Sequence, residues 1–81
     1  MFDKLKQLKQ LKEMQEAIKK ETVTVEREGI KITLNGNFEV EELELSSALS
    51  AQKQSDFLKQ CFNEAVKKVQ MNLAQKFSGL I

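Results

Sequence analysis

The sequence predicts an α+β protein in which a helix, a three-stranded antiparallel sheet and a second helix follow one another (α-β-β-β-α). Three observations lead to this fold class: helix-forming segments at both ends, a central segment in which apolar and polar residues alternate, and turn-forming pairs between the alternating runs. The 81 residues are expected to form a single domain over residues 1–81. Its helices are expected at about 2–21 and 51–78, and its strands within about 22–45.

The first helix is predicted by a segment rich in Lys, Gln, Leu and Glu that contains no Gly or Pro. Its apolar residues recur every three or four positions: Phe2, Leu5, Leu8, Leu11, Met14 and Ile18. A spacing of three lags the helical repeat, so each such step rotates the apolar surface by about 60°. The apolar surface is therefore a broad arc, which indicates a helix that contacts more than one neighbour.

The central segment is predicted to form strands because apolar and polar residues alternate in it from Thr22 onward. Glu28–Gly29 marks the first turn and Asn35–Gly36 marks the second. Asn-Gly between alternating runs is the strongest short hairpin signal. We therefore expect a tight turn there, with a positive φ at both of its central residues.

The third strand is expected to contain a β-bulge. Val40 continues the alternation, but the apolar phase then slips by one residue at Glu41–Glu42. A bulge at that point would keep Leu43 and Leu45 on the buried face. The glutamates around this strand are expected to form a solvated edge rather than a cation site.

The second helix is expected to start between Ala51 and Asp56, after a linker with candidate capping serines. Gly79 is placed to end it. Cys61 lies beside its apolar stripe and is expected to be a small buried hydrophobe. The stripe itself comprises Leu58, Phe62, Ala65, Val66, Val69, Leu73 and Phe77.

Composition excludes most catalytic and metal chemistry. The chain has no His and one Cys, so neither a histidine-dependent triad nor a four-thiolate zinc site can be built. Its three glycines stand far apart, so it has no glycine-rich phosphate loop. The sequence therefore predicts no catalytic residue, no cofactor, no metal and no small-molecule substrate. With no apolar run long enough for a membrane span, a cytoplasmic protein without membrane association is expected.

Helix length favours a dimer. A helix of about 25 residues is near 37 Å long, whereas a strand of six residues spans about 20 Å. The helices must therefore project beyond the sheet with apolar residues exposed, and a second copy is the simplest cover. The candidate interface residues are Phe2, Leu5, Leu8, Leu11, Phe62 and Phe77.

The small net charge of +1 hides a strong segregation. Residues 1–20 carry six basic and three acidic side chains, and residues 46–81 carry five basic and two acidic ones. Residues 21–45 carry two basic side chains against seven glutamates. Lysine-bearing helices suit sequence-independent contact with the phosphates of DNA, while an acidic sheet would face away from them. The simpler interpretation is that these lysines only solvate helix faces. The few aromatic residues are all Phe at expected core positions, so single-strand or RNA binding is not indicated.

The sequence also resembles a known family. The segments KQLKEMQE at 9–16, IKITLNG at 30–36, VEELEL at 40–45 and FNEA at 62–65 followed by VKKVQ occur in this order. Together they resemble the YbaB/EbfC family of nucleoid-associated proteins over nearly the whole chain. The Asp-Pro turn common in that family is replaced here by SSALS.

The resemblance implies a small bacterial cytoplasmic, nucleoid-associated protein that binds double-stranded DNA with little sequence preference. It further implies a sheet-centred homodimer with projecting helices, and recombination-repair proteins as further partners. The lysines carried over as DNA contacts are Lys4, Lys6, Lys9, Lys12, Lys67, Lys68 and Lys76.

A second class of function stays open at this stage. The chain would then be a protein-interaction or scaffolding dimer without direct DNA binding, which recruits a partner through its apolar helix ends or its sheet edge. An enzymatic function has no supporting set of residues.

Overall fold

The predicted α-β-β-β-α fold is confirmed in a computed structural model of the chain. The structure describes residues 2–78, and for Phe2 and Phe77 it describes the backbone only. Its elements, which agree with the expected boundaries to within a few residues, are α1 (Phe2–Lys20), β1 (Thr22–Arg27), β2 (Ile30–Asn35), β3 (Val40–Glu44) and α2 (Ala51–Phe77).

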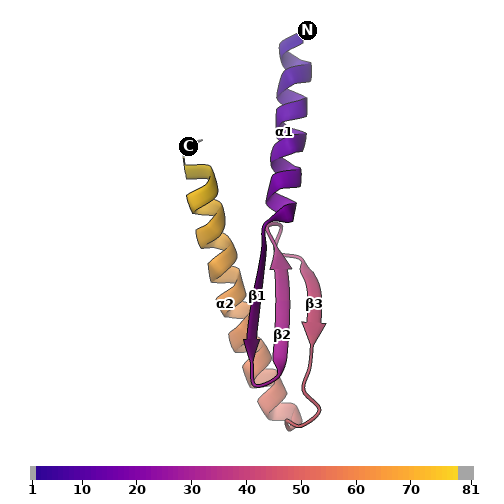
Figure 1. Cartoon of the computed structure of the whole chain (residues 1–81), viewed down its shortest axis with the longest axis vertical. Coiled ribbons are helices and arrows are strands. Elements are labelled where there is room, and N and C mark those ends of the chain that lie inside the picture. Colours follow the sequence, from indigo (N-terminus) through magenta and orange to yellow (C-terminus); the bar gives the residue numbers. More distant parts are fainter. Residues whose placement is uncertain (1, 79–81) are drawn as a thin grey trace.

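The molecule has two layers, a sheet and one covering helix. The strands lie in the order β1-β2-β3, and both neighbouring pairs are antiparallel. Helix α2 packs across β1 and β2, whereas β3 lies at the far side of the sheet (Figure 1). The face away from α2 is polar, and on it the hydroxyls of Thr24 and Thr33 form a hydrogen bond of 2.8 Å.

The core lies between α2 and the first two strands. It comprises Val23, Val25, Ile30, Ile32, Leu34, Cys61, Ala65 and Val69. Cys61 is fully buried, as expected, and is part of the core stripe of α2 rather than beside it. The expectation that every phenylalanine lies in the core is wrong for Phe38 and Phe62, which are 41% and 39% exposed.

The tight two-residue turn lies in the first hairpin and not in the second, where the sequence predicts it. Glu28 and Gly29 both have positive φ (53° and 82°), so the tight two-residue turn is the first one. In the second turn the only positive φ is at Phe38 (61°), and the expectation of positive φ at Asn35–Gly36 is wrong. The physical reason is the loop length: Gly36–Phe38 is a three-residue loop, whose last residue takes the left-handed conformation.

Gly36 is required for a different reason. A Cβ atom at this position would lie 1.9 Å from the carbonyl oxygen of Ile18, near the end of α1. The β2–β3 loop therefore packs directly against the backbone of α1. This contact sets where the helix leaves the sheet.

The predicted bulge in β3 is confirmed, but α2 does not cover the apolar side chains that the bulge keeps on one face. Leu34 pairs with Val40 and Thr33 with Glu42, so Glu41 is the additional residue. Leu43, opposite Ile32, thus shares the apolar face of the sheet. Leu43 and Leu45 are nevertheless 50% and 57% exposed, because α2 does not extend over β3. The expectation that they are buried is wrong.

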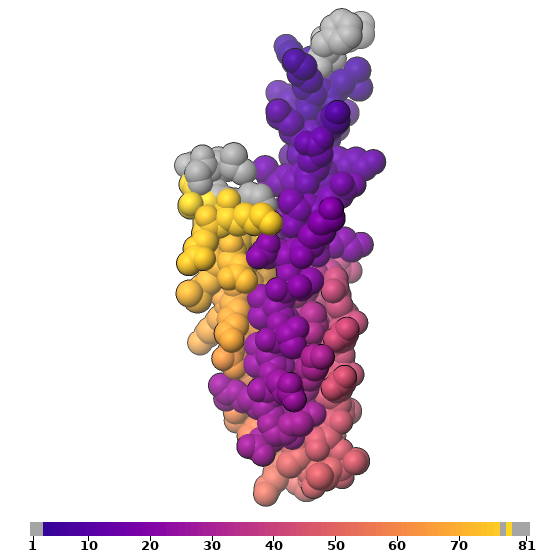
Figure 2. Space-filling view, in the orientation of Figure 1, coloured from indigo at the N-terminus to yellow at the C-terminus, as the bar shows by residue number. Residues whose placement is uncertain are grey.

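Helix α1 projects beyond the sheet. The described part of the molecule measures 59 × 19 × 13 Å, and α1 forms one end of the long axis (Figures 1 and 2). Leu5, Leu8 and Leu11 are 66%, 62% and 55% exposed, so the expectation that this helix contacts several neighbours is not met within one chain.

Helix α2 starts where the serine linker predicts. The Ser50 hydroxyl accepts a hydrogen bond of 3.3 Å from the backbone N–H of Lys53, which makes Ser50 the N-cap. The helix ends at Phe77, and the expected stop at Gly79 lies outside the described residues.

Candidate nucleic-acid interface

The projecting α1 carries a group of exposed lysines. Lys6, Lys9 and Lys12 recur every third residue, and each follows one of the exposed leucines by one position. Since residues three apart form a ridge on a helix, a basic ridge runs beside a leucine ridge. Among residues 2–78 no carboxylate forms an ion pair with any of the α1 lysines predicted to bind DNA, which are Lys4, Lys6, Lys9 and Lys12.

The lysines of α2 are in a different electrostatic setting. All three candidates are exposed, but Lys68 lies 3.6 Å from a carboxylate oxygen of Glu64, and Lys76 lies 3.0 Å from one of Glu21. Only Lys67 is without such a partner among the described residues. Within residues 2–78, the candidate lysines without an ion-pair partner are therefore the four of α1 and Lys67.

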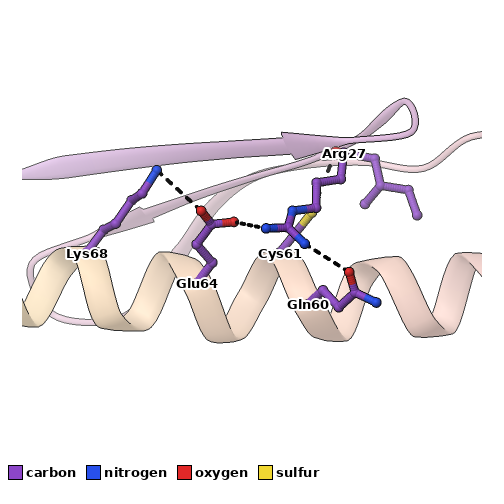
Figure 3. A network of polar contacts seen from close by, with 6 residues as sticks. Arg27, Gln60, Cys61, Glu64 and Lys68 are labelled. Atoms are coloured by element: carbon purple, nitrogen blue, oxygen red, sulfur yellow. Dashed lines mark hydrogen bonds and ion pairs between the residues drawn. The ribbon is translucent and has the colours of Figure 1, made fainter.

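Glu64 also holds the first hairpin to α2 (Figure 3). Arg27 on β1 forms an ion pair of 3.1 Å with Glu64 and donates a hydrogen bond of 3.0 Å to Gln60. Cys61 lies beneath this guanidinium, and burial raises the pKa of its thiol. Sequence reasoning assigned no contact to Arg27. The structure gives it a packing role, because it joins β1 to the helix that covers the core.

A polar hollow of about 430 Å³ lies at the junction between α1 and the sheet. Lys12 and Lys19 line it from α1 together with Glu16, and Asn37 lines it from the β2–β3 loop. Sequence reasoning did not bring Lys19 and Asn37 together. The signal that would have found this junction is Gly36, whose missing side chain permits the close approach of loop and helix.

A second, apolar groove of about 360 Å³ lies between β3 and α2. Its apolar lining residues are Ile32, Val40, Leu43, Leu58 and Phe62. Of the expected interface residues, only Phe62 lines it, while Leu5, Leu8 and Leu11 lie on α1. Phe2 and Phe77 lie outside the described side chains. Val40 and Leu43 were missed because their alternation predicted burial.

The described residues were also considered as metal ligands and as membrane-spanning segments. Within residues 2–78, no group of three or more Cys, Asp or Glu side chains is placed to hold a metal ion. No helix in that range is long and apolar enough to cross a membrane.

Together these features define a class of protein: a small α+β protein whose exposed basic helix projects from an acidic sheet, as suits contact with a polyanion. The chain belongs to the YbaB/EbfC DNA-binding family, whose model matches residues 1–81. This family is DNA-binding and nucleoid-associated, and it is not a family of enzymes. No match is found among the curated proteins or among the solved structures.

Proposed function

We propose that this chain is a single nucleoid-associated domain that acts as a homodimer and contacts the backbone of duplex DNA through helix lysines with little sequence specificity. The observation that carries the proposal is the projecting α1 with four exposed lysines that have no carboxylate partner among the described residues. Such lysines keep their full charge for phosphate groups. The paired Lys68 and Lys76 would contribute less, because binding DNA would compete with Glu64 and Glu21.

A titration of duplex DNA at two salt concentrations tests this proposal. Affinity should fall steeply as salt rises, because each neutralised phosphate contributes about −0.9 to the slope of log K against log salt. Lys9→Glu together with Lys12→Glu should weaken binding and reduce that slope by about 2. Lys53→Glu makes the same change of charge on the first turn of α2, away from α1 and outside the β3–α2 groove, and is the matched control for Lys9→Glu alone. Equal binding by Lys9→Glu and Lys53→Glu would refute the role of α1.

The homodimer is proposed to form over β3, where α2 leaves the apolar face of the sheet uncovered. Val40 and Leu43 are each half exposed, and together with Phe62 they line an apolar groove that a second copy would fill. Association through this face would leave the α1 arms projecting. Sedimentation should give about twice the mass of 9.3 kDa, and Leu43→Asp should reduce it to the monomer value. A wild-type monomer at micromolar concentration would refute this part of the proposal.

The exposed leucines of α1 support a second candidate function, a scaffolding dimer that recruits another protein without binding DNA. In that case wild-type protein would fail to retard DNA at low salt. A purified partner, such as a recombination-repair protein, would bind wild type and would not bind Leu8→Asp.

A further inference from the structure

Phe38 combines two unfavourable features. It is the only residue with positive φ in the β2–β3 loop, at 61°, and this left-handed conformation costs about 1–2 kcal/mol for a residue with a side chain. Its side chain is also 41% exposed. Glycine or asparagine would fit this backbone without strain, so local folding does not account for a large aromatic side chain there.

The loop is held in this conformation by Asn35, which is only 2% exposed. Its Oδ1 accepts hydrogen bonds from the backbone N–H groups of Asn37 (2.9 Å) and Glu39 (3.1 Å). Its carbonyl accepts a third, of 2.9 Å, from the N–H of Phe38 itself. Strain of this kind persists where surrounding contacts over-determine it, and it is common at functional positions.

Two lysines of α1 lie beside the loop, where they are placed to hold the phosphates of a nucleic acid. Asn37, the neighbour of Phe38, lines the junction hollow together with Lys12 and Lys19. Four carboxylates also lie at this end of the sheet. Glu16 lines the hollow, Glu21 directly precedes β1 and pairs with Lys76, and Glu39 and Glu41 accept hydrogen bonds of 3.3 and 3.4 Å from the side chain of Asn35. The remaining glutamates of residues 21–45 lie further toward the first turn: Glu26, Glu28, Glu42 and Glu44.

We propose that Phe38 is an apolar wedge that contacts a base step of the DNA bound by α1. The inference rests on the proposed function and goes beyond it, because backbone contact by lysines needs no aromatic residue. A hairpin tip is narrow enough to enter a DNA groove, and inserted Phe side chains partly unstack base steps and bend the duplex. Lys12 and Lys19 would hold the adjacent phosphates. Flexible pyrimidine–purine steps should therefore bind better than stiff A-tracts.

The test compares three variants of the full chain on an end-labelled duplex of about 30 base pairs that contains TA steps. Phe38→Asn removes the ring and suits the left-handed backbone, while Phe38→Tyr keeps the ring. Glu28→Asn is the matched control. It relieves the backbone strain of the other described non-glycine residue with positive φ (53°), at the opposite end of the sheet. Affinity and salt slope are measured by anisotropy, and bending is measured by energy transfer between the DNA ends.

Phe38→Asn should weaken binding about five- to tenfold and abolish bending, as expected for the loss of one base–aromatic contact. The salt slope should stay unchanged because no phosphate contact is lost. Phe38→Tyr should bind and bend DNA as wild type does, and Glu28→Asn should bind no more weakly than wild type.

Wild-type affinity and bending by Phe38→Asn would overturn the wedge alone and leave the lysine contacts standing. A wild-type protein that fails to retard DNA at low salt would overturn the proposed function and the wedge with it. A fall of more than roughly 5 °C in the melting temperature of Phe38→Asn, corresponding to about 1 kcal/mol, would assign the ring to packing and would also overturn the proposal.

Discussion

Replacing Gly36 by alanine should separate α1 from the sheet. The added Cβ would lie 1.9 Å from the carbonyl oxygen of Ile18 and 2.8 Å from its carbonyl carbon. Both obstacles are backbone atoms, so no side chain can rotate away to make room. The two segments would have to move apart by about 1 Å or more, since Cβ contacts below 3.0 Å essentially never occur.

The cost of this substitution can be set against typical values. Overpacking costs 1–3 kcal/mol, and a clash with backbone belongs at the upper end, so we expect a loss of about 3 kcal/mol. In a domain of this size that lowers the melting temperature by roughly 12 °C or more. Because φ at Gly36 is not positive, left-handed backbone strain contributes nothing to this value.

Urea and thermal unfolding at equal protein concentration measure the effect, since a dimer's stability depends on concentration. Gly29→Ala is the matched control. Its Cβ would lie 3.2 Å from the side chain of Ser46, and its cost comes from a φ of 82°, so about 1 kcal/mol is expected. A Gly36→Ala variant as stable as wild type would refute the close packing of α1 on the loop.

Three further predictions concern groups that hold the fold together. Asn35→Ala should cost about 2–3 kcal/mol, because two loop N–H groups lose their acceptor beside a buried position, and a loss below ~0.5 kcal/mol in thermal unfolding would contradict this. Arg27→Gln should cost only about 0.5–1 kcal/mol, because Arg27 and Glu64 are 47% and 34% exposed, and a shift above ~2 kcal/mol in urea unfolding would show that solvent screens the pair less than assumed. Burial raises the pKa of the Cys61 thiol, so above pH ~9 the unfolded chain releases this proton while the native state keeps it, and stability should fall as pH rises through that range. Cys61→Ala should lack this part of the decline between pH 7 and 10, and parallel curves for the two proteins would contradict it.

Local pattern accounts for the order and type of every element. Alternation from Thr22 onward predicts strands, and the phase slip at Glu41–Glu42 predicts the observed bulge, because both depend only on which side chains share a face. The N-cap at Ser50 follows in the same way from a serine before a helix-forming run. The exposed lysines of α1 could be predicted equally well, since they lie on a helix far longer than the strands beside it.

The sequence pattern did not predict burial correctly where burial depends on which element packs over a residue. Leu43 carries the same apolar signal as Ile32, yet only the latter is covered, because α2 crosses β1 and β2 and stops short of β3. Cys61 rather than Phe62 enters the core for a similar reason: its position on α2 points toward Ile30, whose carbonyl oxygen lies 3.9 Å from its Sγ. The candidate interface was therefore predicted only in part.

The same distinction applies to charge and to the turns. That the helices are basic and the sheet acidic is a property of the chain alone, since it depends on counting side chains in consecutive segments. Which lysines keep their charge free is a tertiary property, because Lys76 meets Glu21 only after 55 residues of chain have folded back. The close approach of Gly36 to the backbone of Ile18 is tertiary in the same sense, because the loop reaches the end of α1 only once β1 and β2 have paired.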